Sequence, residues 1–195
     1  GSEMCIRDSP YIAEWSPYHG AAYAVIEATA RLVATGANWS QARFSYQEYF
    51  ERMDKQAERF GQPVSALLGS IEAQFQLGLP SIGGKDSMSG TFEELTVPPT
   101  LVAFGVTTAD SRRVLSPEFK AAGQYIYYIP GQAISEDIDF DLIKSNFETF
   151  AAIQDSYTIT SASAVKYGGV IESLALAIFG NRIGAIVAVS YTHLR

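Results

Sequence analysis

A short glycine-rich segment contains the residues that are best suited to bind a ligand. It reads Gly83-Gly84-Lys85-Asp86-Ser87-Met88-Ser89-Gly90. Two adjacent glycines allow the backbone to adopt positive φ in a turn and to approach a ligand closely. A lysine and two serines add a cation and two hydroxyl groups. Backbone amides helped by such groups form a cradle for a phosphate oxyanion. The spacing alone is more often that of an ordinary Gly-Gly turn with solvated polar residues, so both interpretations stay open on these residues.

The elements expected to position this loop are a helix before it and a strand after it. Pro63 is typical of the first turn of a helix, and Gly78 is typical of its end. Residues 100–108 are β-rich and mostly uncharged, which predicts a buried strand. The loop would then lie where open α/β sheets usually bind ligands. The apolar stripe predicted for the helix comprises Val64, Leu67, Leu68, Ile71 and Phe75.

Two segments further upstream also have helical patterns. Residues 19–35 are rich in alanine, with apolar side chains at helical spacing, and Gly36 follows them as a typical C-cap. Residues 44–60 are aromatic on one side and charged on the other, which we interpret as a second helix.

Downstream of a break in composition, strand and helix patterns alternate again. Residues 111–123 form this break, which predicts a hinge between two subdomains. Residues 125–129 then predict a strand, and residues 139–154 and 169–179 predict helices. Such an alternation indicates a fold of the α/β class.

The composition is that of an ordinary globular protein. The 195 residues are 47% hydrophobic and 18% charged, with a formal net charge of -7. An acidic balance disfavours binding to nucleic acid or to an anionic membrane, and no apolar run is long enough to span a bilayer. A phosphate site would therefore need local positive potential from backbone amides, single basic residues or Mg²⁺. The single cysteine, Cys5, excludes a disulfide framework and fits a reducing, cytoplasmic setting.

Both ends of the chain differ in character from the sequence between them. We interpret residues 1–9 as a non-native leader and residues 186–195 as a non-native tail, and exclude both from the predicted fold. Residues 10–113 are expected to form an N-terminal subdomain. Residues 114–185 are expected to form part of a C-terminal α/β subdomain.

Several motifs together resemble the phosphoribosylformylglycinamidine synthase family, also called formylglycinamide ribonucleotide amidotransferase. The strongest are the Gly-Gly loop, the Val97-Pro98-Pro99-Thr100 motif and the Thr107-Thr108-Ala109-Asp110 motif. The resemblance is closest to the long single-chain bacterial form and covers about residues 10–185. It implies an aminoimidazole ribonucleotide synthase-like fold of two subdomains, the second of them truncated here. Within the long form, the chain is similar to the second of two such repeats. Weaker matches lie at residues 20–28, 36–37, 44–50, 168–170 and 179–181.

The resemblance implies an ATP-dependent carbon–nitrogen ligase of purine biosynthesis. The family converts formylglycinamide ribonucleotide, ATP and glutamine into formylglycinamidine ribonucleotide, ADP, phosphate and glutamate, with Mg²⁺ at the transferring phosphoryl group. The main ATP site and the glutaminase domain that supplies ammonia are expected outside this chain, so the chain alone is expected to be inactive. The residues implied to contact a phosphate of the substrate or of an auxiliary nucleotide are Gly83, Gly84, Lys85, Asp86, Ser87 and Ser89.

Glu27 is the candidate metal ligand that the resemblance suggests. A carboxylate within an alanine-rich helix is unfavourable unless it is paired or metal-bound, and nucleotide-holding relatives use a glutamate here for Mg²⁺ together with an asparagine one turn later. This chain has Arg31 at that second position, which favours an ion pair with Glu27 instead. The acidic motif that many relatives carry before the last helix is also replaced, by residues 163–169. We therefore assign no definite cofactor to this fragment.

Two other functions remain open. The chain could be a non-catalytic, structural or dimer-like half that completes a partner's site. It could also come from another ATP-using member of the superfamily, such as aminoimidazole ribonucleotide synthase or selenophosphate synthetase, although residues 47–50 and the Gly-Gly-Lys-Asp-Ser loop favour the amidotransferase. Weaker site candidates, interpreted as solvated helix termini, are His19, Asp137, Asp139 and Asp141.

Overall fold

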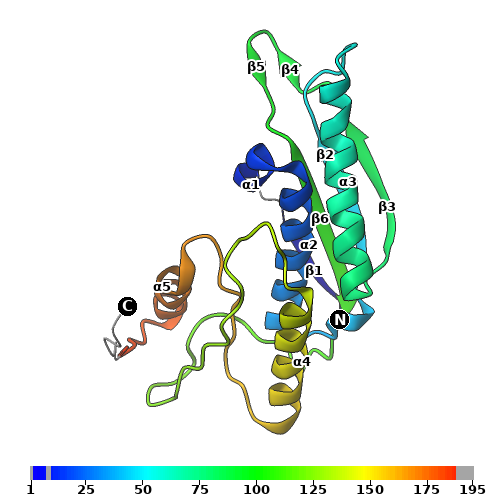
Figure 1. Cartoon of the computed structure of the whole chain (residues 1–195). Coiled ribbons are helices and arrows are strands. Elements are labelled where there is room, and N and C mark those ends of the chain that lie inside the picture. Colours follow the sequence, from blue (N-terminus) through cyan, green and yellow to red (C-terminus); the bar gives the residue numbers. More distant parts are fainter. Residues whose placement is uncertain (1, 8–9, 188–195) are drawn as a thin grey trace, which may run out of the picture.

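A four-stranded sheet forms the centre of the computed structural model, which describes residues 2–7 and 10–187 (Figure 1). The strand order is β1-β6-β2-β3. Strand β6 pairs antiparallel with both β1 and β2, whereas β3 runs parallel to β2 at one edge. The strands are β1 (Ser2–Arg7), β2 (Arg43–Tyr49), β3 (Ser81–Ser87) and β6 (Thr100–Thr108), with β4 (Thr91–Phe92) and β5 (Leu95–Thr96) forming a separate hairpin.

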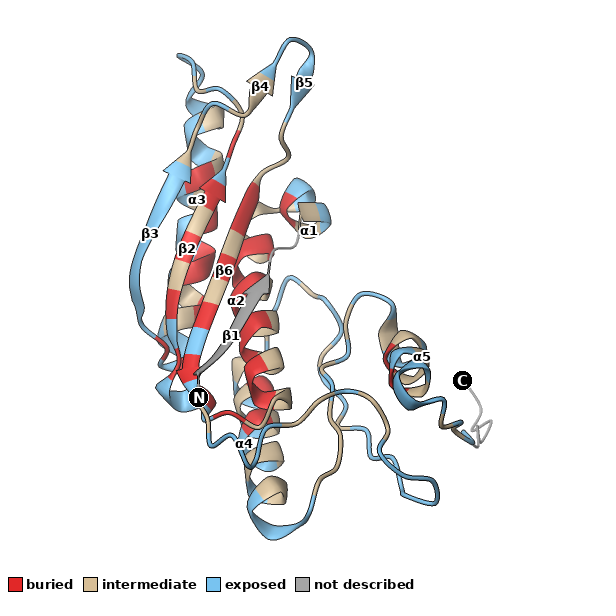
Figure 2. Cartoon of the chain, turned by 180° about the vertical axis from the view of Figure 1, so that it is seen from behind, coloured by how far each residue is buried: buried red, intermediate tan, exposed pale blue. Residues whose placement is uncertain are grey.

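Helices cover one face of this sheet and leave the other face open. Helices α2 and α3 pack on the covered face, and α4 packs against both of them. Seen from behind, the second face of the sheet carries no helix of the described residues (Figure 2). None of the described helices combines the length and apolarity that crossing a membrane requires. The helices are α1 (Pro10–Trp15), α2 (Pro17–Ala34), α3 (Ala57–Leu77), α4 (Phe140–Ser156), α5 (Gly169–Asn181) and a short 3₁₀ helix, η1 (Trp39–Gln41).

Helix α2 is the predicted alanine-rich helix, and its ends follow from local chemistry. Ser16 is its N-cap and accepts a hydrogen bond from the amide of His19, and Pro17 occupies the first turn. At the other end, Gly36 adopts a φ of 82° and donates its amide to the carbonyl of Val33. The predicted helix and its glycine C-cap are confirmed.

Helix α3 lies close against α2 because the contact is made by small residues. A Cβ atom added to Gly69 would lie 1.9 Å from the carbonyl oxygen of Tyr18, so the two backbones touch at this point. Such a close approach allows the alanine-rich face of α2 to pack without cavities. The buried residues of α3 are Pro63, Ala66, Gly69, Ser70, Ala73 and Leu77.

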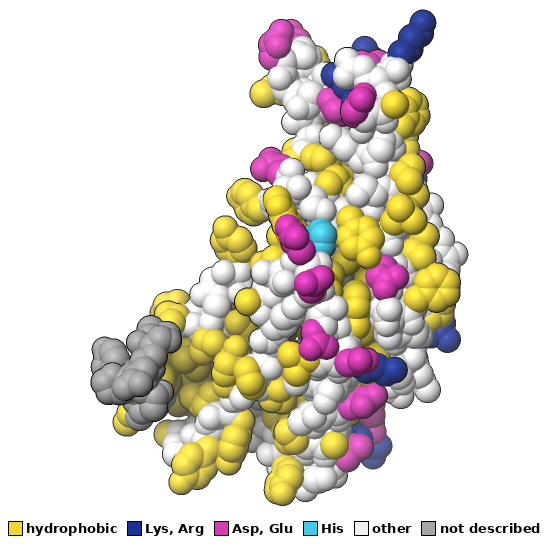
Figure 3. All heavy atoms as spheres, in the orientation of Figure 1, with side chains coloured by type: hydrophobic (Ala, Val, Ile, Leu, Met, Phe, Trp, Pro, Cys, Tyr) yellow, Lys and Arg dark blue, Asp and Glu magenta, His cyan; other side chains and the backbone are white. Residues whose placement is uncertain are grey.

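The predicted apolar stripe of α3 exists but faces away from the core. Its five residues are each at least 42% exposed, and Phe75 is 80% exposed. Figure 3 shows hydrophobic side chains along the edge of the molecule where α3 lies in Figure 1. The expectation that an apolar stripe faces the core is wrong here, because the core contact uses the opposite, small-residue side of the helix.

The predicted second helix over residues 44–60 is wrong. Its first half is strand β2, in which burial alternates, so that Phe44, Tyr46 and Glu48 are buried while Arg43 and Tyr49 are exposed. A period of two is the signature of a strand with one buried face. An irregular segment, residues 50–56, then leads into α3.

Helix α3 begins at Ala57 rather than at Pro63, which lies inside the helix. Its predicted end is confirmed, because Gly78 adopts a φ of 69° and donates its amide to the carbonyl of Phe75. Strand β6 and helices α4 and α5 also occupy their predicted positions.

The strand predicted at residues 125–129 is not formed. The segment has no regular secondary structure, and Tyr125 and Tyr127 are 88% and 86% exposed. Strand propensity needs a neighbouring edge to satisfy the backbone, and residues 114–187 contribute only α4, α5 and irregular segments to the described structure.

Part of the segment interpreted as a leader takes part in the sheet. The backbone of Ser2–Arg7 pairs with β6, with Ser2 opposite Thr108 and Arg7 opposite Ala103. The exclusion of these residues from the fold was therefore wrong, although their interpretation as non-native sequence stays a prediction. Of the predicted tail, residues 188–195 lie outside the described residues.

The contact at Gly69 predicts a strong effect of one methyl group. We expect Gly69→Ala to lower the free energy of unfolding by about 2 kcal/mol, because its Cβ would meet a backbone carbonyl that can move only if α2 and α3 separate. Gly61→Ala, in the same helix with open space around its Cβ, should instead stabilise the protein by up to about 1 kcal/mol. Urea unfolding measures both changes, and similar effects at the two glycines would contradict the close contact.

Candidate functional site

The predicted phosphate-binding residues form an edge strand rather than a turn. Gly83, Gly84, Lys85, Asp86 and Ser87 belong to β3, and Ser89 follows it. Neither glycine adopts positive φ, so the predicted Gly-Gly turn is wrong. The second glycine has another use, because a Cβ on Gly84 would lie 3.0 Å from the carbonyl oxygen of Tyr46 in the adjacent strand. Phosphate binding by these residues stays a prediction.

The strand places the candidate side chains on two different faces of the sheet. Lys85 is opposite Gln47, and Asp86 is opposite the buried Glu48. Side chains alternate along a strand, so Lys85 and Ser87 project toward the open face and Asp86 toward the helix-covered face. The cation and one hydroxyl are thus about 7 Å apart along one exposed edge, a spacing that can bracket a phosphate.

The segment after β3 is fixed by backbone hydrogen bonds to two other segments. The amide of Phe50 donates to the carbonyl of Ser87 at 2.9 Å, and the amide of Gly90 donates back to the carbonyl of Phe50 at 2.9 Å. The amide of Val97 donates to the carbonyl of Gly90 at 2.8 Å, and a Cβ on Gly90 would lie 2.1 Å from Val97 Cγ1. The Val-Pro-Pro-Thr motif therefore holds the position of the residues around Ser89.

Two cavities lie outside the predicted site. One, of about 250 Å³, is lined by Glu14, Glu51, Gln62 and residues 96–99. The other, of about 370 Å³, is lined by Tyr18, Glu72, Gln76 and residues 136–141. Both linings carry carboxylates and no basic side chain, so neither favours a phosphate.

Glu48 is the titratable residue that the sequence analysis missed. Its side chain is only 4% exposed, and its Oε1 atom has no hydrogen-bond partner among the described residues. Burial, together with the nearby charge of Asp86, raises the pKa of Glu48 to about 7. The signal was the alternation of Phe44, Tyr46 and Glu48, which becomes visible once the segment is taken as a strand.

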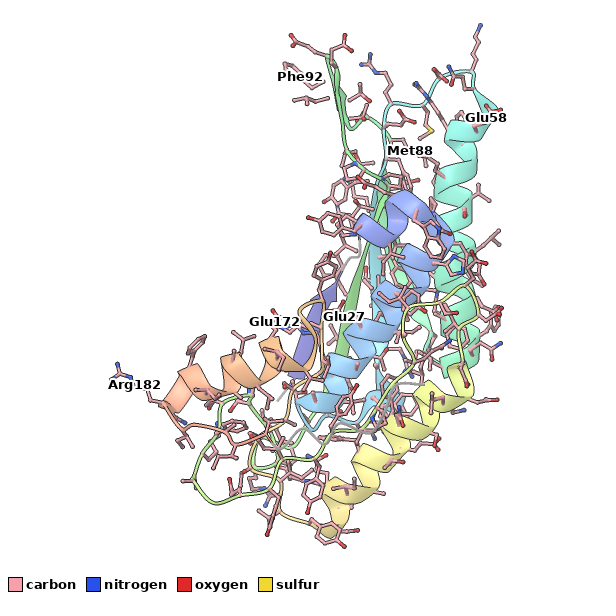
Figure 4. All side chains as sticks on the ribbon, turned by 60° about the vertical axis from the view of Figure 1, so that its left-hand side comes forward. Glu27, Glu58, Met88, Phe92, Glu172 and Arg182 are labelled. Atoms are coloured by element: carbon pink, nitrogen blue, oxygen red, sulfur yellow. The ribbon has the colours of Figure 1, made fainter. Side chains whose placement is uncertain are left out.

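The surroundings of Glu27 do not fit a magnesium site. Glu27 is half-buried on α2 (Figure 4). In the sequence of the same helix, Arg31 follows one turn later. Within residues 10–187, no three His, Cys, Asp or Glu side chains come together in a way that could hold a metal ion. Mg²⁺ prefers several oxygen ligands, so we derive no chemical step through a metal at this position.

The N-terminus of α5, which would attract an anion, already binds a carboxylate of the same helix. The amide of Gly168 donates to Glu172 Oε2 at 2.9 Å, and Gly169 begins the helix with a φ of 70°. A helix N-terminus attracts anions, and here the carboxylate of Glu172 takes that place. An external anion would have to compete with this side chain.

The remaining candidates have structural partners. His19 Nδ1 lies 2.8 Å from Ser16 Oγ, and its Nε2 lies 3.0 Å from the carbonyl oxygen of Glu136. His19 therefore ties the start of α2 to the segment before α4, which is more than the solvated role that we expected. Asp139 is the N-cap of α4 and accepts a hydrogen bond from the amide of Leu142 at 2.9 Å, as a helix start requires.

Solved structures of one enzyme share this fold. Thermotoga maritima PurL complexed with ATP matches with a TM-score of 0.72 and 16% sequence identity, over 93% of this chain and 29% of that chain. The chain is PurL-like in fold. T. maritima PurL complexed with FGAR matches with a TM-score of 0.68 and 12% identity, over 93% of this chain and 32% of that one. T. maritima phosphoribosylformylglycinamidine synthase II matches with a TM-score of 0.63 and 14% identity, over 92% and 28%.

The similarity to PurL concerns the fold alone at these identities. It confirms the predicted aminoimidazole ribonucleotide synthase-like α/β fold. The chain spans less than one third of the length of the PurL structures that it matches. No protein-family model matches the sequence, and no curated protein matches it in sequence. Assignment to the long form and to its second repeat stays a prediction.

The buried carboxylate predicts an unusual dependence of stability on pH. The folded-state pKa of Glu48, about 7, lies above the ordinary value of 4.5, so the folded state binds more protons between these two values. Stability should therefore fall as the pH rises from about 5 to 7. Glu48→Gln should abolish this fall and stabilise the protein at pH 8, on the order of 2 kcal/mol.

Denaturant unfolding between pH 5 and pH 8 measures this difference. Glu94→Gln removes an exposed carboxylate from the β4–β5 hairpin and serves as the control. Parallel pH profiles for all three proteins would show that Glu48 is ionised in the folded state at little penalty.

Proposed function

We propose that the chain is a phosphate-contacting part of a longer, PurL-like, ATP-dependent synthase of purine biosynthesis. The parent enzyme would convert formylglycinamide ribonucleotide, ATP and glutamine into formylglycinamidine ribonucleotide, ADP, phosphate and glutamate. The observation that carries this proposal is the fold match over 93% of the chain to PurL complexed with ATP and to PurL complexed with FGAR. Both of those ligands bear phosphate groups.

Strand β3 is the part of the chain that we assign to phosphate contact. Lys85 supplies a positive charge and Ser87 a hydroxyl on the open side of the sheet, and a Cβ on Gly83, two residues before Lys85, would have no atom within 4 Å. The free edge of β3 also offers backbone amides that no neighbouring described strand uses. Lysine with hydroxyl and amide donors is a typical phosphate-binding set.

The rest of the reaction belongs to parts of the parent outside this chain. The PurL structures are more than three times as long as the segment that the chain matches. We assign to those parts the main ATP and Mg²⁺ site, the glutaminase that releases ammonia from glutamine, and most contacts to the substrate. We also propose a cytoplasmic location.

A structural role is the second candidate. The open face of the sheet can receive another half of the parent. The occupied N-terminus of α5 favours a piece that completes a site without performing chemistry, as does the lack of a metal-ligand cluster around Glu27 among the described residues. Because the fold match to PurL extends over 93% of this chain, another ATP-using relative, such as aminoimidazole ribonucleotide synthase, is the weaker candidate.

The phosphate role of Lys85 predicts a ligand-dependent melting temperature. We expect inorganic phosphate at about ten times its Kd to raise the Tm by a few degrees, since such binding adds about 1.4 kcal/mol to stability. Lys85→Met should remove this rise, and Lys55→Met, at an exposed position before α3, should keep it. Sodium chloride at equal ionic strength is the salt control, and a phosphate effect that survives Lys85→Met would sink the assignment.

The fragment's incompleteness predicts that it has no synthase activity by itself. With formylglycinamide ribonucleotide, ATP, Mg²⁺ and ammonia supplied, we expect no ADP above background, because one repeat lacks the main ATP site. We also expect weak or no binding of Mg-ADP in calorimetry, since Arg31 stands near Glu27. Turnover by the 195-residue chain, or tight metal-dependent ADP binding, would show that the working site lies within it.

A further inference from the structure

Six large apolar side chains lie along the outward side of α3 and form what we call the outer stripe. They recur at the spacing of one helix face, and none of the described helices or strands covers them (Figures 1 and 4). Their exposed fractions are Phe60 50%, Val64 55%, Leu67 43%, Leu68 54%, Ile71 42% and Phe75 80%.

The outer stripe forms a large apolar patch on the surface of the described residues. Together the six residues expose on the order of 600 Å² of mostly apolar surface, the upper end for the largest patch of a typical monomer. The opposite side of the same helix makes the core contact through Gly69 and other small residues. Packing within the chain therefore does not explain why the outward side is apolar.

The order of residues in the outer stripe is symmetric about its centre. Reading inward from both ends pairs Phe60 with Phe75, Val64 with Ile71, and Leu67 with Leu68. When two copies of such a helix lie antiparallel, each pair forms one layer of similar size across the contact. A surface that matches itself in this way suits an isologous, two-fold interface.

We propose that the outer stripe is an interface between two copies of this chain, with their α3 helices antiparallel. The two-fold axis passes between Leu67 and Leu68, so that Leu68 of each copy faces Leu67 of the other copy. Burial of both stripes would remove about 1,200 Å² from water, which reaches the lower limit of specific protein interfaces.

Charges around the outer stripe permit this arrangement. At the antiparallel register, Glu58 lies opposite Leu77, Arg59 opposite Gln76, and Glu72 opposite Pro63. No like charges meet across the interface, so electrostatic repulsion does not oppose it. Gly61 adds no side chain at the rim, and a Cβ there would have open space around it.

Sedimentation velocity of the chain over a range of concentrations tests the proposal. We expect a monomer–dimer equilibrium that Leu67→Lys weakens at least tenfold. Leu176→Lys, the same change at an exposed leucine of α5, should leave it unchanged. Circular dichroism confirms that each variant is folded, which is expected because both positions are exposed.

The same experiment separates this interface from the open face of the sheet. Val106→Lys changes an exposed residue of that face. Dimerisation that responds to Val106→Lys but not to Leu67→Lys would overturn the proposal, as would a chain that stays monomeric at its highest soluble concentration. The latter result would mean that another segment of a longer parent covers the stripe. The proposal does not depend on the proposed function.

A disulfide tests the register itself. In a Cys5→Ser background, mild oxidation of an equimolar mixture of the Leu67→Cys and Leu68→Cys proteins should give a covalent heterodimer, because these two positions face each other across the antiparallel contact. Gln76→Cys should stay monomeric under the same conditions. Equal cross-linking of the mixture and of Gln76→Cys would indicate non-specific association and would overturn the antiparallel register.

Discussion

The contact between α2 and α3 determines how the rest of the molecule is arranged. At Gly69 the two helix backbones come so close that no side chain fits against the Tyr18 carbonyl. This contact requires small residues on the inner side of α3, and the large apolar residues of the helix lie on its outer side. It also sets the depth of the layer into which Phe44 and Tyr46 of β2 project, and these two rings stack with centroids 6.0 Å apart.

The two faces of the sheet at strand β3 differ in their electrostatic conditions. Glu48 faces the helix layer, where burial raises the pKa of its carboxyl group, and Asp86 lies opposite it in the neighbouring strand. Lys85 faces the open side, in a protein whose net charge is -7. The alternation of side chains along β3 thus keeps the acidic pair away from any anion that binds on the open side. In the predicted turn, by contrast, Asp86 and Lys85 would not be separated onto two faces of a sheet.

The sequence allowed some parts of this fold to be predicted and not others, for identifiable physical reasons. Helices α2, α4 and α5 were predictable from the helical pattern of their residues, and for α2 also from Gly36 after its end. Residues 44–60 mix a strand and the start of a helix, and their aromatic residues satisfy either period over a short window. For α3, periodicity correctly identified which residues share a face, but only the tertiary contact decides whether that face is covered. The burial of Glu48 could not be inferred without first knowing that it lies on a strand.

The pairing of β1 with β6 also bears on how the chain reaches its folded state. Ser2 lies opposite Thr108, so this edge of the sheet joins segments separated by about a hundred residues of intervening chain. Closing so long a loop is entropically unfavourable until other contacts have shortened it, and pairings of this kind slow folding. The α2–α3 hairpin with β2 between its helices can assemble from nearer contacts, which brings β6 and finally β1 into place. Because β1 precedes β6 in the chain, it is synthesised before its partner, and its edge stays unpaired until β6 has been made.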